Sequence, residues 1–156
     1  MKYVFDTINR MRYTFPTHIN DLVIDRADAK TSEVFIVIVK PGKATHLHRH
    51  DDVEQIFYIV EGEGALFIGP QKKKFNVKPA QVVKIPPKTL HTVRAKGKKA
   101  LRYICIDCFC PNRKNNELTW TSHVHEICRE QGYNFKDVIG AAKPKQKGRL
   151  NNGTSR

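Results

Sequence analysis

Turn-forming residues recur along this chain at short intervals and limit the folds that it can adopt. They stand at Pro41-Gly42, Gly62-Glu63-Gly64, Gly69-Pro70, Pro86-Pro87 and Lys96-Gly97-Lys98. Runs rich in Val, Ile, Phe and Thr lie between them and predict strands at 21–25, 33–39, 44–50, 54–60, 63–68, 73–77, 81–85, 91–95 and 99–106. Short strands with this spacing favour an all-β fold, an antiparallel sandwich or barrel.

The pattern changes after Cys110-Pro111. Val124, Ile127 and Cys128 have helical spacing, and Gly132 can close a helix in a left-handed cap. We therefore predict a short C-terminal helix at about 122–131, with a possible second turn near 135–139.

The chain is long enough for one core and short for two. Its 156 residues and 40% hydrophobic content predict a single domain over residues 1–142. Residues 143–156 offer only Leu150 as a large apolar side chain, so we expect a flexible basic tail there.

The formal net charge is +13, and the tail carries five of these positive charges without an acidic residue. A basic surface of this kind is usually only solvated, but it can also attract phosphates, carboxylates or nucleic acid. No helix-turn-helix, RNA-recognition aromatic pair or glycine-rich phosphate loop accompanies the charge, so a nucleic-acid partner is not favoured.

Charged residues break every apolar run in residues 2–30, which predicts neither a signal peptide nor a membrane span and suggests a cytoplasmic protein. In that setting the four cysteines are expected to be reduced thiols.

Histidines occupy every second position at His46, His48 and His50, and Glu54 and Gln55 follow closely. On a strand, residues two apart point to the same side, so the three imidazoles share one face. Neutral imidazoles suit first-row divalent ions, and a neighbouring strand beginning near Glu54 could add an oxygen ligand. The alternative is a polar, histidine-rich strand without a metal.

Residues 42–62 resemble the first motif of the cupin family. That motif has a glycine, five residues, His-x-His, three or four residues, a carboxylate or amide ligand, six residues and a glycine. The matching positions are Gly42, His48, His50, Gln55 and Gly62. The match leaves His46 outside the ligand set or at the edge of the pocket.

Glu54 is the alternative to Gln55 as the third ligand. A carboxylate is the more usual ligand, and three residues separate Glu54 from His50, but seven then remain before Gly62. Strand alternation favours Gln55, because Gln55 would face inward with Phe57 while Glu54 faces outward.

The second cupin motif supplies a histidine from a later strand. Pro86 and His91 stand in the expected relation, whereas Ala80, Lys88 and Ala95 depart from the usual residues. The resemblance covers about 35–106. It implies a cupin-type double-stranded β-helix, a jelly-roll barrel, that is usually dimeric and holds a metal.

The resemblance therefore implies one mononuclear site made by His48, His50, Gln55 and His91. A neutral ligand set leaves the ion electrophilic, so we expect a small, anionic or oxygenated ligand. The ligand types do not distinguish among Mn, Fe, Co, Ni, Cu and Zn.

Other candidate residues are less specific. Tyr58 and Tyr103 carry hydroxyl groups on strands, and four cations surround His91 in the sequence, namely Lys84, Lys88, Arg94 and Arg102. A second metal site is conceivable but does not match a zinc-knuckle spacing; its donors would be Cys108, Cys110, His123, His125 and Cys128. No catalytic residue is assigned.

Three hypotheses follow for the function. The first is a metal-dependent enzyme with isomerase, dioxygenase or lyase chemistry, because the cupin family includes all three. The second is a metal-containing ligand-binding or sensor module without turnover, and the third is a basic barrel associated with nucleic acid.

Overall fold

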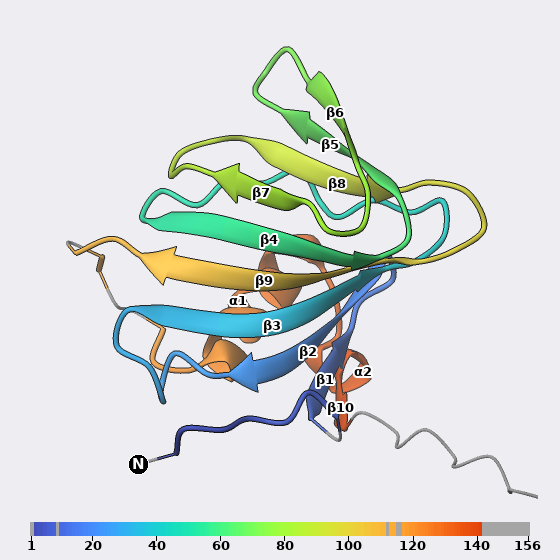
Figure 1. Ribbon diagram of the computed structural model, residues 1–156. Helices are drawn as coiled ribbons and strands as arrows, with labels where there is room; N and C mark the ends of the chain where they lie inside the picture. The colour runs from blue at the N-terminus through green and yellow to red at the C-terminus, as the bar shows by residue number, and fades with distance from the viewer. Residues whose placement is uncertain (1, 9, 112, 115–116, 142–156) are drawn as a thin grey trace, which may run out of the picture.

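The computed structural model describes residues 2–8, 10–111, 113–114 and 117–141, and its strands form two antiparallel sheets. The larger sheet has the strand order β10-β1-β2-β3-β9-β4-β7 (Figure 1). Its strands are β1 (Met11–Thr14), β2 (His18–Ile24), β3 (Ser32–Val39), β4 (Val53–Glu61), β7 (Val82–Ile85), β9 (Leu101–Phe109) and β10 (Ile139–Ala141). The smaller sheet has the order β6-β5-β8, with β5 (Gly64–Ile68), β6 (Lys73–Val77) and β8 (His91–Ala95).

These two sheets form the predicted all-β jelly-roll barrel. Strands β3 and β4 both pair with β9, so β9 is an interior strand of the larger sheet. Every second residue of β4 is buried along its first seven positions, from Val53 to Ile59, as expected for a strand with one face on the core. Alternation in β4 fixes which of its side chains reach the barrel interior.

The segment 44–50, predicted as a strand, does not form one. It makes only two isolated bridges to β8, Ala44 with Arg94 and His48 with His91. Thr45 lies between them and donates its backbone N–H to the Val93 carbonyl. The segment is therefore extended and follows β8 without a continuous ladder.

Two strands near the ends of the described part of the chain were not expected. Strand β1 begins at Met11 after a charged, irregular segment, and β10 has only three residues, Ile139–Ala141. They pair with each other, so the end of the described chain returns to the edge of the larger sheet. A three-residue strand is too short to produce a period-2 signal in the sequence.

Helix α1 (Trp120–Gln131) begins two residues before the prediction and ends as predicted at Gly132, whose φ of 70° is left-handed. Thr119 and Ser122 form a capping box at its start, which satisfies backbone donors that the helix leaves free. A further single turn, α2 (Phe135–Val138), follows near the predicted position.

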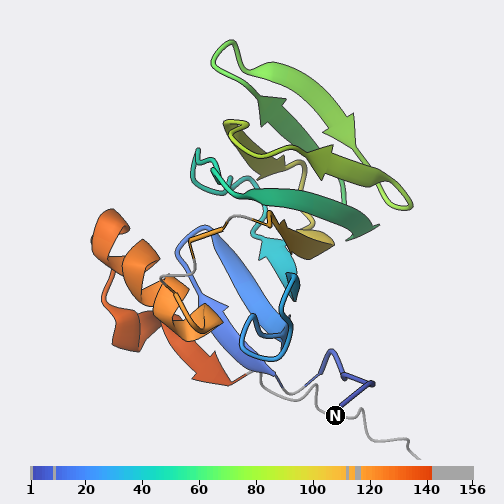
Figure 2. The same ribbon diagram turned by 90° about the vertical axis from the view of Figure 1, so that its left-hand side faces the viewer.

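Helix α1 and the smaller sheet cover different parts of the larger sheet (Figure 2). Trp120, Val124 and Cys128 on α1 join the core cluster that includes Tyr13 and Phe35. Leu66 and Val93, from the smaller sheet, join the same cluster.

Two non-glycine residues adopt left-handed backbone conformations in the turns on either side of β7. Ala80 has a φ of 65° and Lys88 a φ of 63°. These are positions where the sequence has a side chain in place of the glycine common in the cupin motif, and a side chain there costs about 1 kcal/mol. The Lys88 N–H donates to the His50 carbonyl at 2.6 Å, which ties this turn to the histidine segment.

Residues 143–156, the predicted tail, lie outside the described residues. In the part of the chain that is described, no helix has the length and apolar character needed to span a membrane.

Candidate functional site

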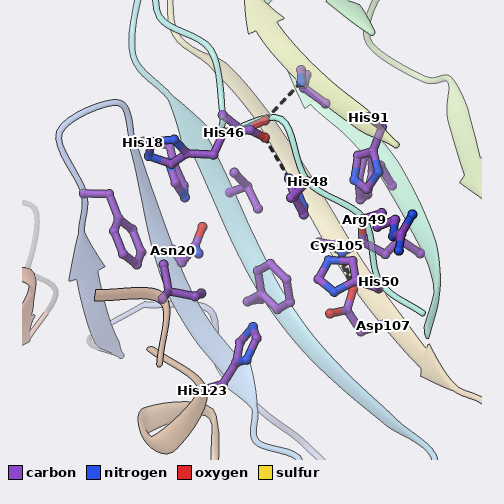
Figure 3. Close-up of a pocket in the computed structure, with 18 of the residues that line it drawn as sticks. His18, Asn20, His46, His48, Arg49, His50, His91, Cys105, Asp107 and His123 are labelled. Carbon is purple, nitrogen blue, oxygen red and sulfur yellow. Dashed lines mark hydrogen bonds between the residues drawn. The ribbon is translucent and has the colours of Figure 1, made fainter. Parts of the chain in front are cut away.

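The site is built around His48 and His91, which lie opposite each other in one of the two isolated bridges. Their backbones exchange two hydrogen bonds, from the His48 N–H to the His91 carbonyl at 3.1 Å and from the His91 N–H to the His48 carbonyl at 2.8 Å. Their ring centroids are 4.3 Å apart, and the His50 ring lies 5.0 Å from the His48 ring. The bridge therefore gathers imidazoles from two distant segments (Figure 3).

Backbone carbonyls orient two of these rings. His48 Nδ1 lies 2.7 Å from the His46 carbonyl, and His91 Nδ1 lies 2.9 Å from the Thr89 carbonyl. A carbonyl can only accept, so Nδ1 carries the proton and Nε2 carries the lone pair in the neutral ring. Metal-binding histidines use the same arrangement, with the second ring nitrogen donating to a backbone oxygen.

Gln55, on β4, contributes an amide oxygen. Its Nε2 donates to Asp107 Oδ1 at 2.8 Å, which turns Oε1 away from that carboxyl group. Glu54 faces the opposite side of the strand, where it pairs with Lys84 at 3.2 Å and its side chain is 34% exposed. Gln55 therefore points into the barrel and Glu54 does not, in agreement with the predicted alternation.

Three buried polar atoms at this point have no hydrogen-bond partner among the residues that the structure describes: His50 Nε2, His91 Nε2 and Gln55 Oε1. A buried acceptor without a partner costs about 1–3 kcal/mol. Imidazole nitrogen and amide oxygen are both ligands for divalent transition metals, so a cation would satisfy all three atoms. The residues present fit a metal ion.

The side chains of these residues are not arranged around a common point as in a metal-bound site. No group of three or more His, Cys, Asp or Glu side chains in the described ranges is arranged to hold an ion. The ring centroids of His50 and His91 are 6.2 Å apart, so the rings would have to turn toward a common centre.

Burial keeps the three imidazoles neutral. It lowers the pKa of His48, lowers that of His50 well below its usual value, and lowers the pKa of His91 to about 4. Neighbouring histidines act in the same direction, because charge on one ring disfavours charge on the next. A neutral ring is the form that binds metals.

A buried polar chain leads away from Gln55. Asp107 and Glu33 are buried cross-strand partners on β9 and β3, and each affects the pKa of the other. Burial, together with the Asp107 charge, raises the pKa of Glu33 to about 7 against the opposing effect of Arg26. The Arg26 guanidinium binds both Glu33 oxygens at 2.7 and 2.8 Å.

Arg26 continues the chain to α1. Its Nη1 donates to Glu117 Oε2 at 2.8 Å, and the same oxygen lies 2.8 Å from His123 Nδ1. Hydrogen bonding by His123 and by Arg26 lowers the pKa of Glu117 to about 2, so this carboxyl group is ionised. Polar contacts thus connect the Gln55 amide to the first turn of α1.

All of these histidines border one cavity of about 320 Å³. Six of the seven histidines in the chain line it: His18, His46, His48, His50, His91 and His123. Apolar side chains such as Phe35, Val37 and Phe57 make up much of the remaining wall. The cavity is within the size range of small-molecule sites.

Two of the cavity histidines were not predicted as part of this site. His18 stands alone in the sequence, and no spacing marks it. His123 had been considered with His125 and three cysteines for a second metal site, but the structure separates them. His125 stacks on Phe135, whereas His123 bonds Glu117 at the cavity.

The remaining candidates lie in other positions. His46 borders the cavity, where its Nε2 lies 2.7 Å from the Tyr133 hydroxyl. Tyr103 is buried in the core and lines the cavity, whereas Tyr58 is 46% exposed on the outer face of β4. Lys88 and Arg94 are exposed, and the four cysteines are free.

Comparison with known proteins adds family information. A family model described as "Cupin domain" matches residues 35–107. An uncharacterised protein of Methanocaldococcus jannaschii is 40% identical over 68 residues, which cover 44% of this chain and 53% of that protein. The match thus spans about half the length of that relative.

Solved structures with similar folds have low sequence identity. A predicted oxalate decarboxylase from Thermotoga maritima gives a TM-score of 0.62 at 16% identity, over 69% of this chain and 99% of that chain. Ectoine synthase from P. lautus gives 0.60 at 14% identity, over 92% and 86%. An RmlC-like cupin from Shewanella frigidimarina gives 0.58 at 12% identity, over 72% and 94%. At these identities the likeness concerns the fold alone.

Proposed function

We propose that the protein is a metal-dependent enzyme acting on a small anionic metabolite, because residues 35–107 match the model of the cupin domain. Its metal would be one divalent transition-metal ion, held by His48, His50, Gln55 and His91. The observation that carries the proposal is the group of unpartnered buried atoms His50 Nε2, His91 Nε2 and Gln55 Oε1 within the described part of the chain.

The ion, when bound, would supply a Lewis acid that polarises a carbonyl or carboxylate oxygen of the substrate. The chain supplies the other requirements. Backbone carbonyls fix the tautomers of His48 and His91, and Asp107 fixes the direction of the Gln55 amide. Phe35 and Phe57 line the cavity, which limits the water around a bound ligand.

Charge supports an anionic ligand. The four proposed ligands are neutral, so the charge of a bound ion would remain uncompensated by them. Asp107, which is not one of the proposed ligands, accepts hydrogen bonds from Gln55 and Cys105 at Oδ1. A substrate carboxylate or other oxyanion would provide the missing negative charge.

The first test measures metal content. The full chain and the double variant His48→Ala, His50→Ala are purified, reconstituted with Mn, Fe, Co, Ni, Cu or Zn, and analysed for bound metal. We expect about one equivalent in the unchanged protein and a loss of more than about tenfold in affinity in the variant. His125→Ala is the matched control, because His125 is exposed and stacks on Phe135 outside the cavity. Equal metal content in all three proteins would contradict the proposal.

The second test separates turnover from binding alone. Small carboxylic acids that raise the melting temperature of the metal-loaded protein are incubated with it, and NMR follows their conversion. An enzyme forms a product that disappears with chelator. Metal-dependent stabilisation by a ligand that remains unchanged throughout would instead indicate a binding or sensor module.

A further inference from the structure

His123 reaches the cavity from a different element than the proposed metal ligands. It lies in the first turn of α1, next to the capped start of the helix at Thr119. Its side chain is 20% exposed and lines the same cavity as His48 and His50. Figure 3 shows its ring pointing from α1 toward the labelled histidine group.

Glu117 determines how this ring is presented. Its Oε2 lies 2.8 Å from His123 Nδ1, and Arg26 holds the same oxygen at 2.8 Å. An ionised carboxylate only accepts, so the neutral His123 ring carries its proton on Nδ1. The Nε2 lone pair is then left for the cavity, and no hydrogen bond to it occurs within the described residues.

Arg26 makes this arrangement rigid. Its side chain is only 4% exposed, and it is fixed on its other edge by two bonds to Glu33. A carboxylate that orients an imidazole, and is itself held, is the arrangement by which enzymes position a proton-transfer histidine. A purely structural contact at the start of α1 would not require the ring to border the cavity.

We propose that His123 is the acid–base residue of this pocket, positioned by Glu117 and acting on the ligand held at the His48–His50–Gln55–His91 centre. This inference rests on the proposed function. In the forward step, His123 Nε2 forms a bond to a proton of the ligand, and the electron pair of the broken C–H or O–H bond stays on the ligand. Glu117 stabilises the resulting imidazolium, which can return the proton at another ligand atom.

The first experiment observes the tautomer without any substrate. Two-bond ¹H–¹⁵N NMR spectra of the full chain, assigned with His123→Gln, should show the Nδ1–H form for neutral His123. Glu117→Ala removes the acceptor, so the His123 ring should shift toward the Nε2–H form that is preferred in free histidine. His125, exposed on the same helix, should give the same spectrum in both proteins. An Nε2–H tautomer in the unchanged protein would overturn the proposal.

The second experiment tests whether His123 reaches a ligand at the metal centre. Bromopyruvate carries a 2-oxo acid group that can bind a metal and a carbon that alkylates nucleophiles. Attack by His123 Nε2 forms an N–C bond and releases bromide, and peptide mass spectrometry locates the product. With metal bound, we expect His123 to be labelled at least about tenfold faster than without metal.

Matched variants distinguish the two proposals. His48→Ala should lose both metal and the faster labelling of His123, and Glu117→Ala should keep the metal but label His123 about tenfold more slowly. His125 and two cysteines outside the cavity, Cys108 and Cys110, should be labelled at rates that do not depend on metal. Normal metal content with no metal-dependent labelling of His123 overturns the role of His123 alone. A protein that binds no metal overturns the proposed function, and this inference with it.

Discussion

The two ends of the Gln55 side-chain amide face different surroundings, and this difference determines how the centre responds to substitution. Nε2 donates to Asp107, whereas Oε1 has no partner in the described chain. Strand alternation was enough to choose Gln55 over Glu54 as the inward residue. The Asp107 contact could not be predicted, because it joins two strands that are 52 residues apart in sequence.

We expect Gln55→Glu to lower the free energy of unfolding of the metal-free protein by about 1–3 kcal/mol. The substitution replaces a donor 2.8 Å from Asp107 Oδ1 with a carboxylate oxygen. Bound metal should recover part of the loss, because a carboxylate is also a ligand. Urea unfolding with and without metal measures both effects.

Glu54→Gln is the control for that variant. Glu54 pairs with Lys84 at the surface, so its loss should change stability by less than about 1 kcal/mol. If Gln55→Glu destabilises the metal-free protein no more than Glu54→Gln does, the Asp107 contact does not have the importance given to it here.

At the level of elements, the turn between β4 and β5 illustrates what a glycine does in this barrel. Gly62 has a φ of 77°, and a Cβ there would overlap the Ala100 carbonyl just before β9. Gly42 has a similar φ of 69°, but nothing lies within 4 Å of the position that its Cβ would take. The sequence motif includes both glycines. The structure shows that Gly62 is also needed for close packing against Ala100, whereas Gly42 is needed only for its backbone conformation.

Gly42→Ala and Gly62→Ala should therefore differ in severity. Gly42→Ala introduces backbone strain alone and should cost about 1 kcal/mol. Gly62→Ala adds a collision with backbone and should cost more than about 3 kcal/mol. Thermal and urea unfolding of the two variants provides the comparison, and equal losses would argue against the close approach of β9.

Prediction of helices and strands succeeded where the residues have a clear periodicity. It was wrong where pairing with a distant segment determines whether a strand forms. The capping glycine and apolar spacing of α1 identified the helix from local signals. The segment 44–50 has strand-like alternation, but its pairing with β8 amounts to two isolated bridges, at Ala44 and at His48, and not to a continuous ladder. The pairing of β1 with β10 depends on the end of the described chain returning to its beginning, which no local pattern encodes.

For the molecule as a whole, six histidines around one cavity make stability depend on pH. Burial lowers the pKa of His18 to about 3, and the His46 and His48 charges add to this effect. Below pH 6.5 the unfolded chain binds a proton at His18 that the folded chain does not. The free energy of unfolding must then fall as pH decreases from about 6.5 toward 3.

Comparison with His18→Gln isolates this contribution. Between pH 7 and pH 5, the metal-free unchanged protein should lose about 1–2 kcal/mol more stability than the variant. Glu33 acts in the opposite direction, since its raised pKa of about 7 favours folding at lower pH, but it is present in both proteins. Urea unfolding at the two pH values measures the difference, and parallel losses in the two proteins would exclude His18 as the cause.

The polar chain from Gln55 to His123 has an implication for sequence divergence. Arg26 has only carboxylates as its ion-pair partners, Glu33 on one edge and Glu117 on the other. A homologue that lacks the Arg26 guanidinium would leave the carboxylates of Glu33 and Glu117 without this counterion. We therefore expect such a homologue to have replaced both carboxylates as well. In an alignment of homologues, these three positions should accordingly vary as a unit, while the surrounding apolar wall drifts independently.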